Sequence, residues 1–340
     1  MKIGILNGGG DCAGLNAVTR AVVRKSELFG YEVLGIRHGW SGLIYVDTVP
    51  LRWEDVRHII NAGGTILHTT RTNPFRHPNG PETVLANVKK LGLDVVIAVG
   101  GEDTLSVGAK LAKMGLKVVG VPKTIDNDIV ETDLTFGFDS ATNVTVEAID
   151  RIQTTGESHD RIMVVEVMGR HAGWISAYAG IASGANLVLV PEETVDLEKV
   201  CAFLKRRHDS GETASIVVVG EGCSISGSSP GNSTKLDEFG HPRLGGIGDL
   251  LAREIERRVH IETRAVVLGH IVRGGPPSAA DRILATRLGV AAVQAVKDEE
   301  YNVMVCLRKN AISRAPLADI LGKMKNLDKE TLALLKDFQI

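Results

Sequence analysis

The apolar residues of this chain form short uninterrupted runs, separated by longer stretches in which they recur every three or four positions. The runs are rich in Val and Ile and cover residues 2–6, 94–99, 117–121, 161–167, 187–190, 215–219 and 264–268. Helical spacing is found between them, as in 139–155, 202–207 and 279–296. Continuous apolar strands that alternate with helices predict an α/β fold with a mainly parallel sheet covered on both faces.

Composition narrows the classes of protein. A length of 340 residues allows two domains, each with its own core. The formal net charge is -2, from 39 basic and 41 acidic residues, so no basic excess favours a nucleic-acid or membrane-surface partner. The four cysteines have no paired spacing, and neither a signal peptide nor an apolar run of about 18 residues is found. We expect a cytoplasmic protein.

The most informative stretch follows the run at 117–121 and carries Lys123, Thr124, Asp126 and Asp128. Charged side chains at the end of a buried strand are costly unless a ligand, a metal or another charge partners them. In open α/β sheets, ligands bind at the carboxyl ends of strands. The stretch therefore predicts a phosphoryl-transfer site with Asp126 as the base.

Two glycine turns precede expected helices. The first, at 7–16, includes Gly9 and Gly10, and glycines there let the backbone approach an anion. A tight strand-to-helix turn would explain the same pattern. The second, at 100–104, adds the acids Glu102 and Asp103, which suit either a phosphate-bound Mg²⁺ or the dipole of a helix N-terminus.

Other polar residues stand at the edges of the apolar runs. Arginines in such places can hold phosphates through paired hydrogen bonds, although each could equally form a structural salt bridge. Arg71, in a polar loop, could be an ordinary surface charge, and His159 and His171 are interpreted as structural. Residues 224–233 are rich in Ser and Gly and predict a surface loop or lid. The candidates at the run edges are Arg161, Arg170, Glu221, Arg264, His270 and Arg273.

Taken together, these segments resemble the 6-phosphofructokinase family over essentially the whole chain. Single motifs of this kind are weak, but six in the family's order are specific. The matching motifs are Gly9-Gly10-Asp11, Gly100-Gly101, Thr124-Ile125-Asp126-Asn127-Asp128, Met168-Gly169-Arg170, Gly220-Glu221-Gly222 and the stretch from Leu268 to Gly275.

The resemblance implies a Mg²⁺-dependent glycolytic or gluconeogenic enzyme that acts on fructose 6-phosphate, with Asp126 taking the proton of the 1-hydroxyl. Thr124 and Asp128 flank Asp126, and Ile125 belongs to the same substrate-binding motif. Met168, Gly169, Arg170 and Glu221 are expected to bind the sugar, and His270 and Arg273 its 6-phosphate. Gly9, Gly10, Arg71, Asp103, Thr104 and Lys123 are expected at the phosphoryl donor, with Glu102 at the metal. Arg161 and Arg264 match positions that reach into a neighbouring subunit's site, which implies a homodimer or homotetramer.

The family's fold implies two similar three-layer α/β domains with the active site in the cleft between them. The donor domain would comprise residues 1–138 plus about 272–300. The sugar-phosphate domain would comprise 139–271 plus about 301–340.

The donor is the main point on which the sequence departs from the common family pattern. The pair Asp103 and Lys123 resembles the pyrophosphate-using members, because ATP users commonly have glycine at both positions. Asp103 would place a negative charge where the α-phosphate of ATP lies, and Val107 is bulkier than the glycine that often lines an adenine pocket. Pyrophosphate is therefore the expected donor, and ATP is the alternative.

The family's effector site is only half matched. Arg20 and Arg24 correspond to basic positions there, but Gln153, Asn186, Glu212 and Ala214 replace charged residues of regulated enzymes. We expect no strong control by ADP or phosphoenolpyruvate.

Three other classes fit less well. A distant NAD or lipid kinase would lack the motifs around Arg170 and His270. A silent regulatory subunit would have lost Asp126. A Rossmann dehydrogenase would need an acid about 20 residues after a Gly-x-Gly-x-x-Gly turn.

Overall fold

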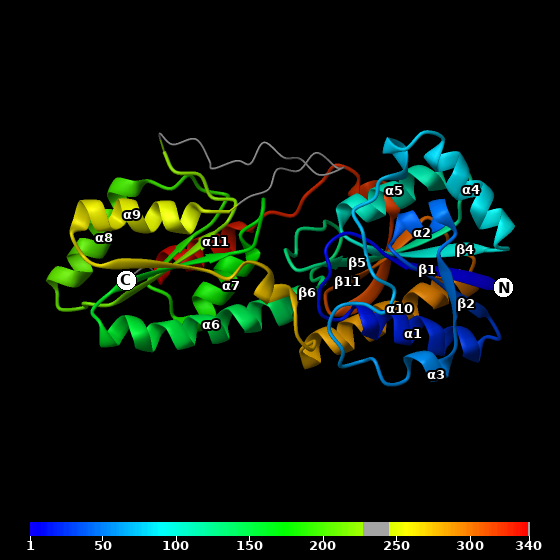
Figure 1. The fold of residues 1–340 in the computed structure, drawn as a ribbon, viewed down its shortest axis with the longest axis horizontal. Coiled ribbons are helices and arrows are strands. Elements are labelled where there is room, and N and C mark those ends of the chain that lie inside the picture. Colours follow the sequence, from blue (N-terminus) through cyan, green and yellow to red (C-terminus); the bar gives the residue numbers. More distant parts are fainter. Residues whose placement is uncertain (227–244, 339–340) are drawn as a thin grey trace.

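The computed structural model describes residues 1–226 and 245–338, and it forms two α/β domains side by side (Figure 1). Most of the loop expected at 224–233 lies outside the described residues. Each of the seven strands expected from the apolar runs overlaps an observed strand. The expected fold class, α/β with mainly parallel sheets, is confirmed.

Among the described residues, the larger sheet has eight strands. Along it the order is β12 (Ala311–Pro316), β11 (Val303–Arg308), β5 (Val118–Thr124), β4 (Val95–Gly100), β1 (Lys2–Asn7), β2 (Glu32–Ile36) and β3 (Thr48–Leu51), and β6 (Phe136–Gly137) pairs separately with β5. Only the two edge strands, β3 and β12, are antiparallel to their neighbours. The central strands β1, β4 and β5 are buried almost throughout, which explains why their sequences are continuously apolar.

Helices cover both faces of this sheet. One face packs on α1 (Leu15–Leu28) and α10 (Ala279–Lys297), and α3 (Trp53–Val56) lies beside α1. The other face packs on α2 (Trp40–Tyr45), α4 (Gly80–Lys90) and α5 (Glu102–Ala112). The short helix η1 (Pro74–Arg76) precedes α4.

In the part of the chain that the structure describes, the smaller sheet has four parallel strands in the order β10 (Thr263–Val267), β7 (Ile162–Val167), β9 (Ser215–Gly220) and β8 (Leu187–Leu189). Helices α8 (Leu197–Asp209) and α9 (Ile247–Val259) cover one face, and α6 (Phe138–Ser158) and α7 (Trp174–Ser183) cover the other. The layer next to α6 and α7 is continuous with the core under α1 and α10. The two domains thus share one hydrophobic cluster.

The last crossing between the domains comes later in the chain than expected. Residues from about 301 onward were expected beside the smaller sheet, but β11 pairs with β5 and β12 pairs with β11 in the larger one. Lys309 and Asn310, both with positive φ, form the tight turn between these two strands. After η3 (Leu317–Ile320) the chain crosses again, and α11 (Lys329–Asp337) packs on α7.

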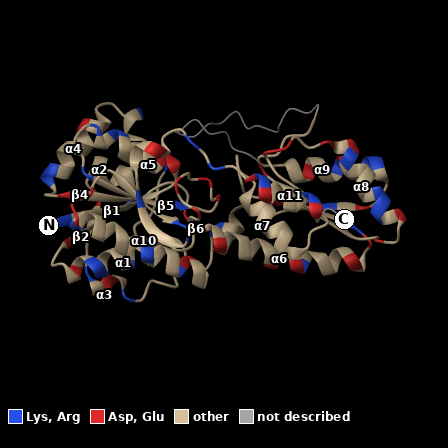
Figure 2. Ribbon diagram, turned by 180° about the vertical axis from the view of Figure 1, so that it is seen from behind, with Lys and Arg blue, Asp and Glu red and all other residues tan. Residues whose placement is uncertain are grey.

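Charge is spread over the surface in both signs. Figure 2 shows Lys and Arg interspersed with Asp and Glu on the helices of both domains. None of the helices within the described residues combines the length and apolar character needed to cross a membrane.

Candidate active site

A cleft of about 280 Å³ lies where the carboxyl ends of β1, β4, β5, β7 and β9 meet. Every one of these strands is followed by residues that line the cleft, as expected for the ligand-binding edge of parallel sheets. Residues predicted from sequence account for most of the lining: Gly9, Gly10, Arg71, Glu102, Asp103, Thr104, Lys123, Thr124, Asp126, Asp128, Met168, Arg170, Glu221 and Arg273.

The glycine turn after β1 is packed tightly against the neighbouring strand ends. Gly9 has a φ of +82°, a conformation that L side chains rarely adopt, and a Cβ at Gly8 would lie 2.5 Å from Thr104 Oγ1. The Gly10 carbonyl accepts a hydrogen bond from Lys123 Nζ. Lys123 is only 3% exposed, and burial lowers the pKa of its ammonium group. The turn and the lysine therefore form one rigid wall of the cleft.

The N-terminus of α5 brings two carboxylates to the same wall. Glu102 and Asp103 lie in its first turn, and both line the cleft. Glu102 Oε1 accepts hydrogen bonds from Ser106 Oγ and, at 3.3 Å, from the backbone N–H of Gly322. Within residues 1–226 and 245–338, no three His, Cys, Asp or Glu side chains are grouped to hold a metal by themselves.

The turn after β5 is held from several directions. Thr124 Oγ1 accepts a hydrogen bond from Asp126 N at 3.1 Å, and Asn127 adopts a left-handed φ of +50°. Asn127 Oδ1 accepts from Thr135 N at 3.1 Å and from Lys325 Nζ at 3.0 Å. The backbone around Asp126 is therefore fixed before any ligand binds.

The two carboxylates of this turn differ in environment. Asp126 Oδ1 is buried and has no hydrogen-bond partner among the described residues. Burial, and then the nearby charge of Asp126, raise the pKa of Asp128 to about 7. A buried acceptor without a donor is costly, so Asp126 is the group in the cleft that most needs a ligand's hydrogen.

The opposite wall comes from the smaller sheet. Arg170 stands in a turn where Gly169 has a φ of +138°, and a Cβ at Gly222 would overlap the Arg170 carbonyl oxygen. Glu221 follows β9, and burial together with Asp126 raises the pKa of its carboxyl group. Arg273 Nη1 donates to the Asp11 carbonyl at 3.0 Å, which joins this wall to the first glycine turn.

Five predicted site residues do not line the cleft. Ile125 is 1% exposed and packs in the core, and Gly169 shapes the turn without reaching the cavity. Arg161 and Arg264 both pair with Glu262, the former at 2.8 Å, and His270 is exposed on η2 (Gly269–Arg273). Val107, expected near a base pocket, is 1% exposed and belongs to the core beneath α5.

Four cleft residues were missed by the sequence analysis. His171, interpreted as structural, lines the cavity together with Arg170. It could have been predicted from the sequence, because it directly follows a residue expected to bind the sugar. Gly322, Lys323 and Met324 also line it. They lie far along the chain in a segment with no motif, so nothing in the sequence pointed to them.

The fold and the cleft are those of an α/β phosphotransferase, with glycine turns, basic side chains and carboxylates at the carboxyl ends of parallel strands. The chain belongs to the phosphofructokinase family, whose model matches residues 2–296. A protein of Amycolatopsis methanolica named pyrophosphate--fructose 6-phosphate 1-phosphotransferase is 52% identical over 332 residues, which cover 97% of each chain. A Mycobacterium bovis protein named ATP-dependent 6-phosphofructokinase is 48% identical and covers 96% of each.

Solved structures agree on the fold. The pyrophosphate-dependent phosphofructokinase of Nitrosospira multiformis superposes with a TM-score of 0.85 at 22% identity, over 96% of this chain and 86% of that one. Phosphofructokinase of Pichia pastoris superposes with a TM-score of 0.83 at 30% identity, over 99% of this chain and 36% of that longer one.

Proposed function

We propose that this protein transfers a phosphoryl group from pyrophosphate to the 1-hydroxyl of fructose 6-phosphate, reversibly and with Mg²⁺. The observation that carries the proposal is Asp126, whose buried Oδ1 has no hydrogen-bond donor among the described residues. It shares the cleft lining with Arg71, Lys123, Arg170 and Arg273. Cations on several sides of one carboxylate suit two phosphorylated substrates around a base.

In this reaction the oxygen of the 1-hydroxyl forms a bond to one phosphorus of pyrophosphate, and the bridging P–O bond breaks to release phosphate. The hydroxyl proton passes to Asp126. A carboxylate in this position typically contributes about 10²–10⁴-fold to the rate. Phosphoryl transfer otherwise depends on positioning and charge neutralisation, which the cleft's cations supply. Arg170 and Arg273 are assigned to the sugar phosphate, with Glu221 at its hydroxyls.

The carboxylate of Glu102 fits a magnesium ion. Mg²⁺ usually takes only one or two protein carboxylates and completes its shell with phosphate oxygens and water. Glu102 lines the cleft together with Gly9 and Gly10. When bound, Mg²⁺ neutralises charge on the phosphate oxygens.

The choice of pyrophosphate rests on Asp103 and Lys123. Both line the cleft next to Gly9 and Gly10, where the donor phosphates are assigned. The buried Lys123 ammonium would stabilise the leaving phosphate, and the Asp103 carboxylate would repel the additional phosphate of ATP. ATP remains the second candidate because relatives of similar identity carry either name.

A homo-oligomer is part of the proposal. Arg161 and Arg264 lie near the start of β7 and on β10, which is an edge strand of the smaller sheet. Arg264 is about half exposed, at 50% of its side chain. These two arginines are therefore assigned to a neighbouring subunit's cleft rather than to their own.

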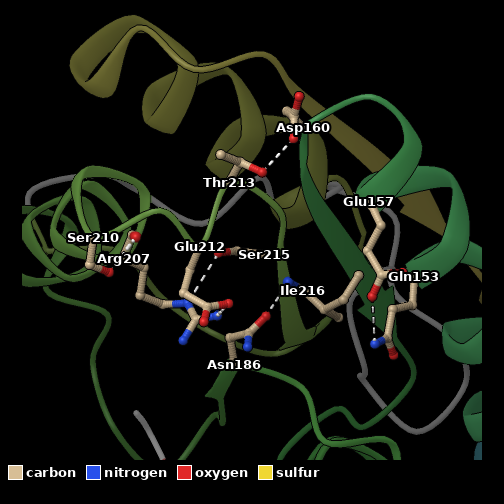
Figure 3. Close-up of polar contacts among 10 residues, drawn as sticks. All are labelled: Gln153, Glu157, Asp160, Asn186, Arg207, Ser210, Glu212, Thr213, Ser215 and Ile216. Atoms are coloured by element: carbon tan, nitrogen blue, oxygen red, sulfur yellow. Dashed lines mark hydrogen bonds and ion pairs between the residues drawn. The ribbon is translucent and has the colours of Figure 1, made fainter.

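No strong control by ADP or phosphoenolpyruvate is expected, since the residues at the half-matched effector positions contact their own chain. Gln153 Nε2 donates to Glu157 at 3.0 Å, Asn186 Oδ1 accepts from Ile216 N at 2.8 Å, and Arg207 pairs with Glu212 at 3.4 Å (Figure 3). The acids in this region would repel a phosphorylated effector.

The two arginines at the matched effector positions also contact their own chain. Arg20 and Arg24 stack over Trp53, with guanidinium carbons 4.7 and 5.2 Å from the ring centroid. A rate curve against fructose 6-phosphate that is sigmoidal and becomes hyperbolic with ADP would contradict this expectation.

The deciding assay measures fructose 1,6-bisphosphate formed from fructose 6-phosphate and Mg²⁺, with pyrophosphate and ATP supplied separately. Activity with pyrophosphate alone supports the full proposal. Activity with ATP alone would overturn the donor assignment and keep the sugar site. No activity with either donor would overturn the proposed function.

A further inference from the structure

The segment at 321–328 crosses from the larger domain to the smaller one along the cleft. It begins after η3 and ends where α11 starts. Gly322, Lys323 and Met324 line the cavity, and the Gly322 N–H is tied to Glu102. We refer to residues 321–328 as the crossing segment.

Lys325, in the middle of the crossing segment, forms hydrogen bonds with the loop that carries Asp126 and Asp128. Its ammonium group donates to Asn127 Oδ1 at 3.0 Å, to the Thr132 carbonyl at 2.9 Å and to the Asp133 carbonyl at 2.8 Å. A lysine has three N–H donors, so all of them are used on this one loop. Its backbone N–H donates in addition to the Asp128 carbonyl at 2.7 Å.

The same segment is anchored to the turn on the opposite wall. Trp174 Nε1 donates to the Lys325 carbonyl at 2.9 Å, and the Lys325 ammonium lies 5.3 Å from the Trp174 ring centroid. Two residues further on, Leu327 N donates to Glu192 Oε1 at 3.0 Å, and Glu192 also accepts from Gly173 N at 3.1 Å. Gly173 and Trp174 end the turn that presents Arg170 to the cleft.

We propose that Lys325 is a positioning residue that sets the Asp126–Asp128 turn against the Arg170 turn across the cleft. The inference rests on the proposed function, in which these two turns hold the base and the sugar phosphate. The Lys325 side chain does not line the cleft and acts on the turn through Asn127. Its backbone N–H contacts the Asp128 carbonyl directly. Nothing in its sequence surroundings assigns it a part in the reaction.

The physical reason is the cost of small displacements. Asn127 holds a left-handed conformation between the two carboxylates, and its side chain has Thr135 N and Lys325 as its hydrogen-bond donors. Removing the Lys325 ammonium group takes three donors from the loop and leaves the backbone N–H of residue 325 on the Asp128 carbonyl. Misplacement of a reacting group by about 1 Å can cost about 10²-fold in rate.

The test compares Lys325→Met with Leu327→Ala in steady-state kinetics. Lys325→Met keeps the apolar stem and removes the three donors, and we expect kcat to fall by about 10²-fold while KM for both substrates stays within about threefold. Leu327 is 7% exposed in the same segment and has no side-chain bond to the turn. Leu327→Ala should lower Tm at least as much as Lys325→Met but leave kcat within about threefold of wild type.

The outcomes separate the claims. Equal losses of kcat in the two variants would show that Lys325 only stabilises the segment and would overturn the inference, as would a near-normal kcat in folded Lys325→Met. Should that variant fail to fold, Lys325→Gln, which cannot reach all three oxygens, takes its place with the same expectation. A wild-type protein inactive with both donors would instead overturn the proposed function, and the inference with it.

Discussion

Asp103→Gly is the substitution that most directly tests the choice of donor. Asp103 lies in the first turn of α5 and lines the cleft wall that carries Gly9, Gly10 and Lys123. If its carboxylate excludes ATP, then removing it should admit ATP. The same change should weaken the use of pyrophosphate, because a residue of the donor pocket is lost.

The expected magnitude follows from the half-buried position of Asp103. Two like charges about 4 Å apart repel by about 1 kcal/mol in water and by about 4 kcal/mol at an effective dielectric constant of 20. A half-buried carboxylate at an open cleft falls between these limits. A value of about 2 kcal/mol corresponds to a gain on the order of 30-fold in kcat/KM for ATP.

The assay measures kcat/KM for ATP and for pyrophosphate at saturating fructose 6-phosphate and Mg²⁺. Asp103→Asn is the matched control, since it removes the charge and keeps the volume of the side chain. A gain in both variants assigns the effect to charge, and a gain in Asp103→Gly alone assigns it to bulk. A folded Asp103→Gly protein that uses pyrophosphate but gains no ATP activity would refute the blocking role.

Three further predictions concern the cleft. Asp126→Asn should keep fructose 6-phosphate binding, measured by calorimetry, and lose about 10²–10⁴-fold in kcat because the base is gone; a near-normal rate would remove Asp126 as the base. The pKa of Asp128 is raised to about 7, so the folded protein holds a proton there that the unfolded chain releases above its ordinary pKa near 4. As the pH rises from about 4 to about 7, the contribution of this group to the free energy of unfolding should therefore fall by up to about 1.4 kcal/mol per pH unit. Asp128→Asn should reduce this pH dependence, measured by urea unfolding at several pH values, and an unchanged dependence would contradict the pKa shift. Gly222→Ala should displace the Arg170 carbonyl and raise KM for fructose 6-phosphate more than it lowers kcat. Unchanged kinetics would contradict this prediction, because they would show that the turn accommodates the added Cβ without moving Arg170.

Much of the fold could be predicted because its signal is local. Buried parallel strands need long apolar runs, and all seven runs became strands. Strand β2 was missed because Glu32 and Gly35 interrupt its apolar residues. Strand β11 was missed although five of its six residues are apolar. The placement of β11 and β12 in the larger sheet depends on pairing with β5, a contact between residues almost two hundred positions apart.

The candidate site was predictable in its chemistry more than in its geometry. Glycine turns and charged residues directly after apolar runs mark the carboxyl ends of strands, and that rule found Asp126, Lys123 and Arg170. Arg161 and Arg264 were selected at the amino edges of apolar runs and by the family resemblance, and they pair with Glu262 and do not line the cleft. A strand end is a local property, whereas the direction in which a long side chain points depends on its neighbours.

The sequence by itself thus determined the alternation of strands and helices, the polar residues at the strand ends and, through motifs in order, the family. The tertiary structure alone decided that residues 321–328 cross the cleft and that Lys325 holds the turn of Asp126. The reason is that hydrophobic periodicity and turn chemistry act over a few residues. The contacts that orient a catalytic turn can come from any part of the chain that packing brings there.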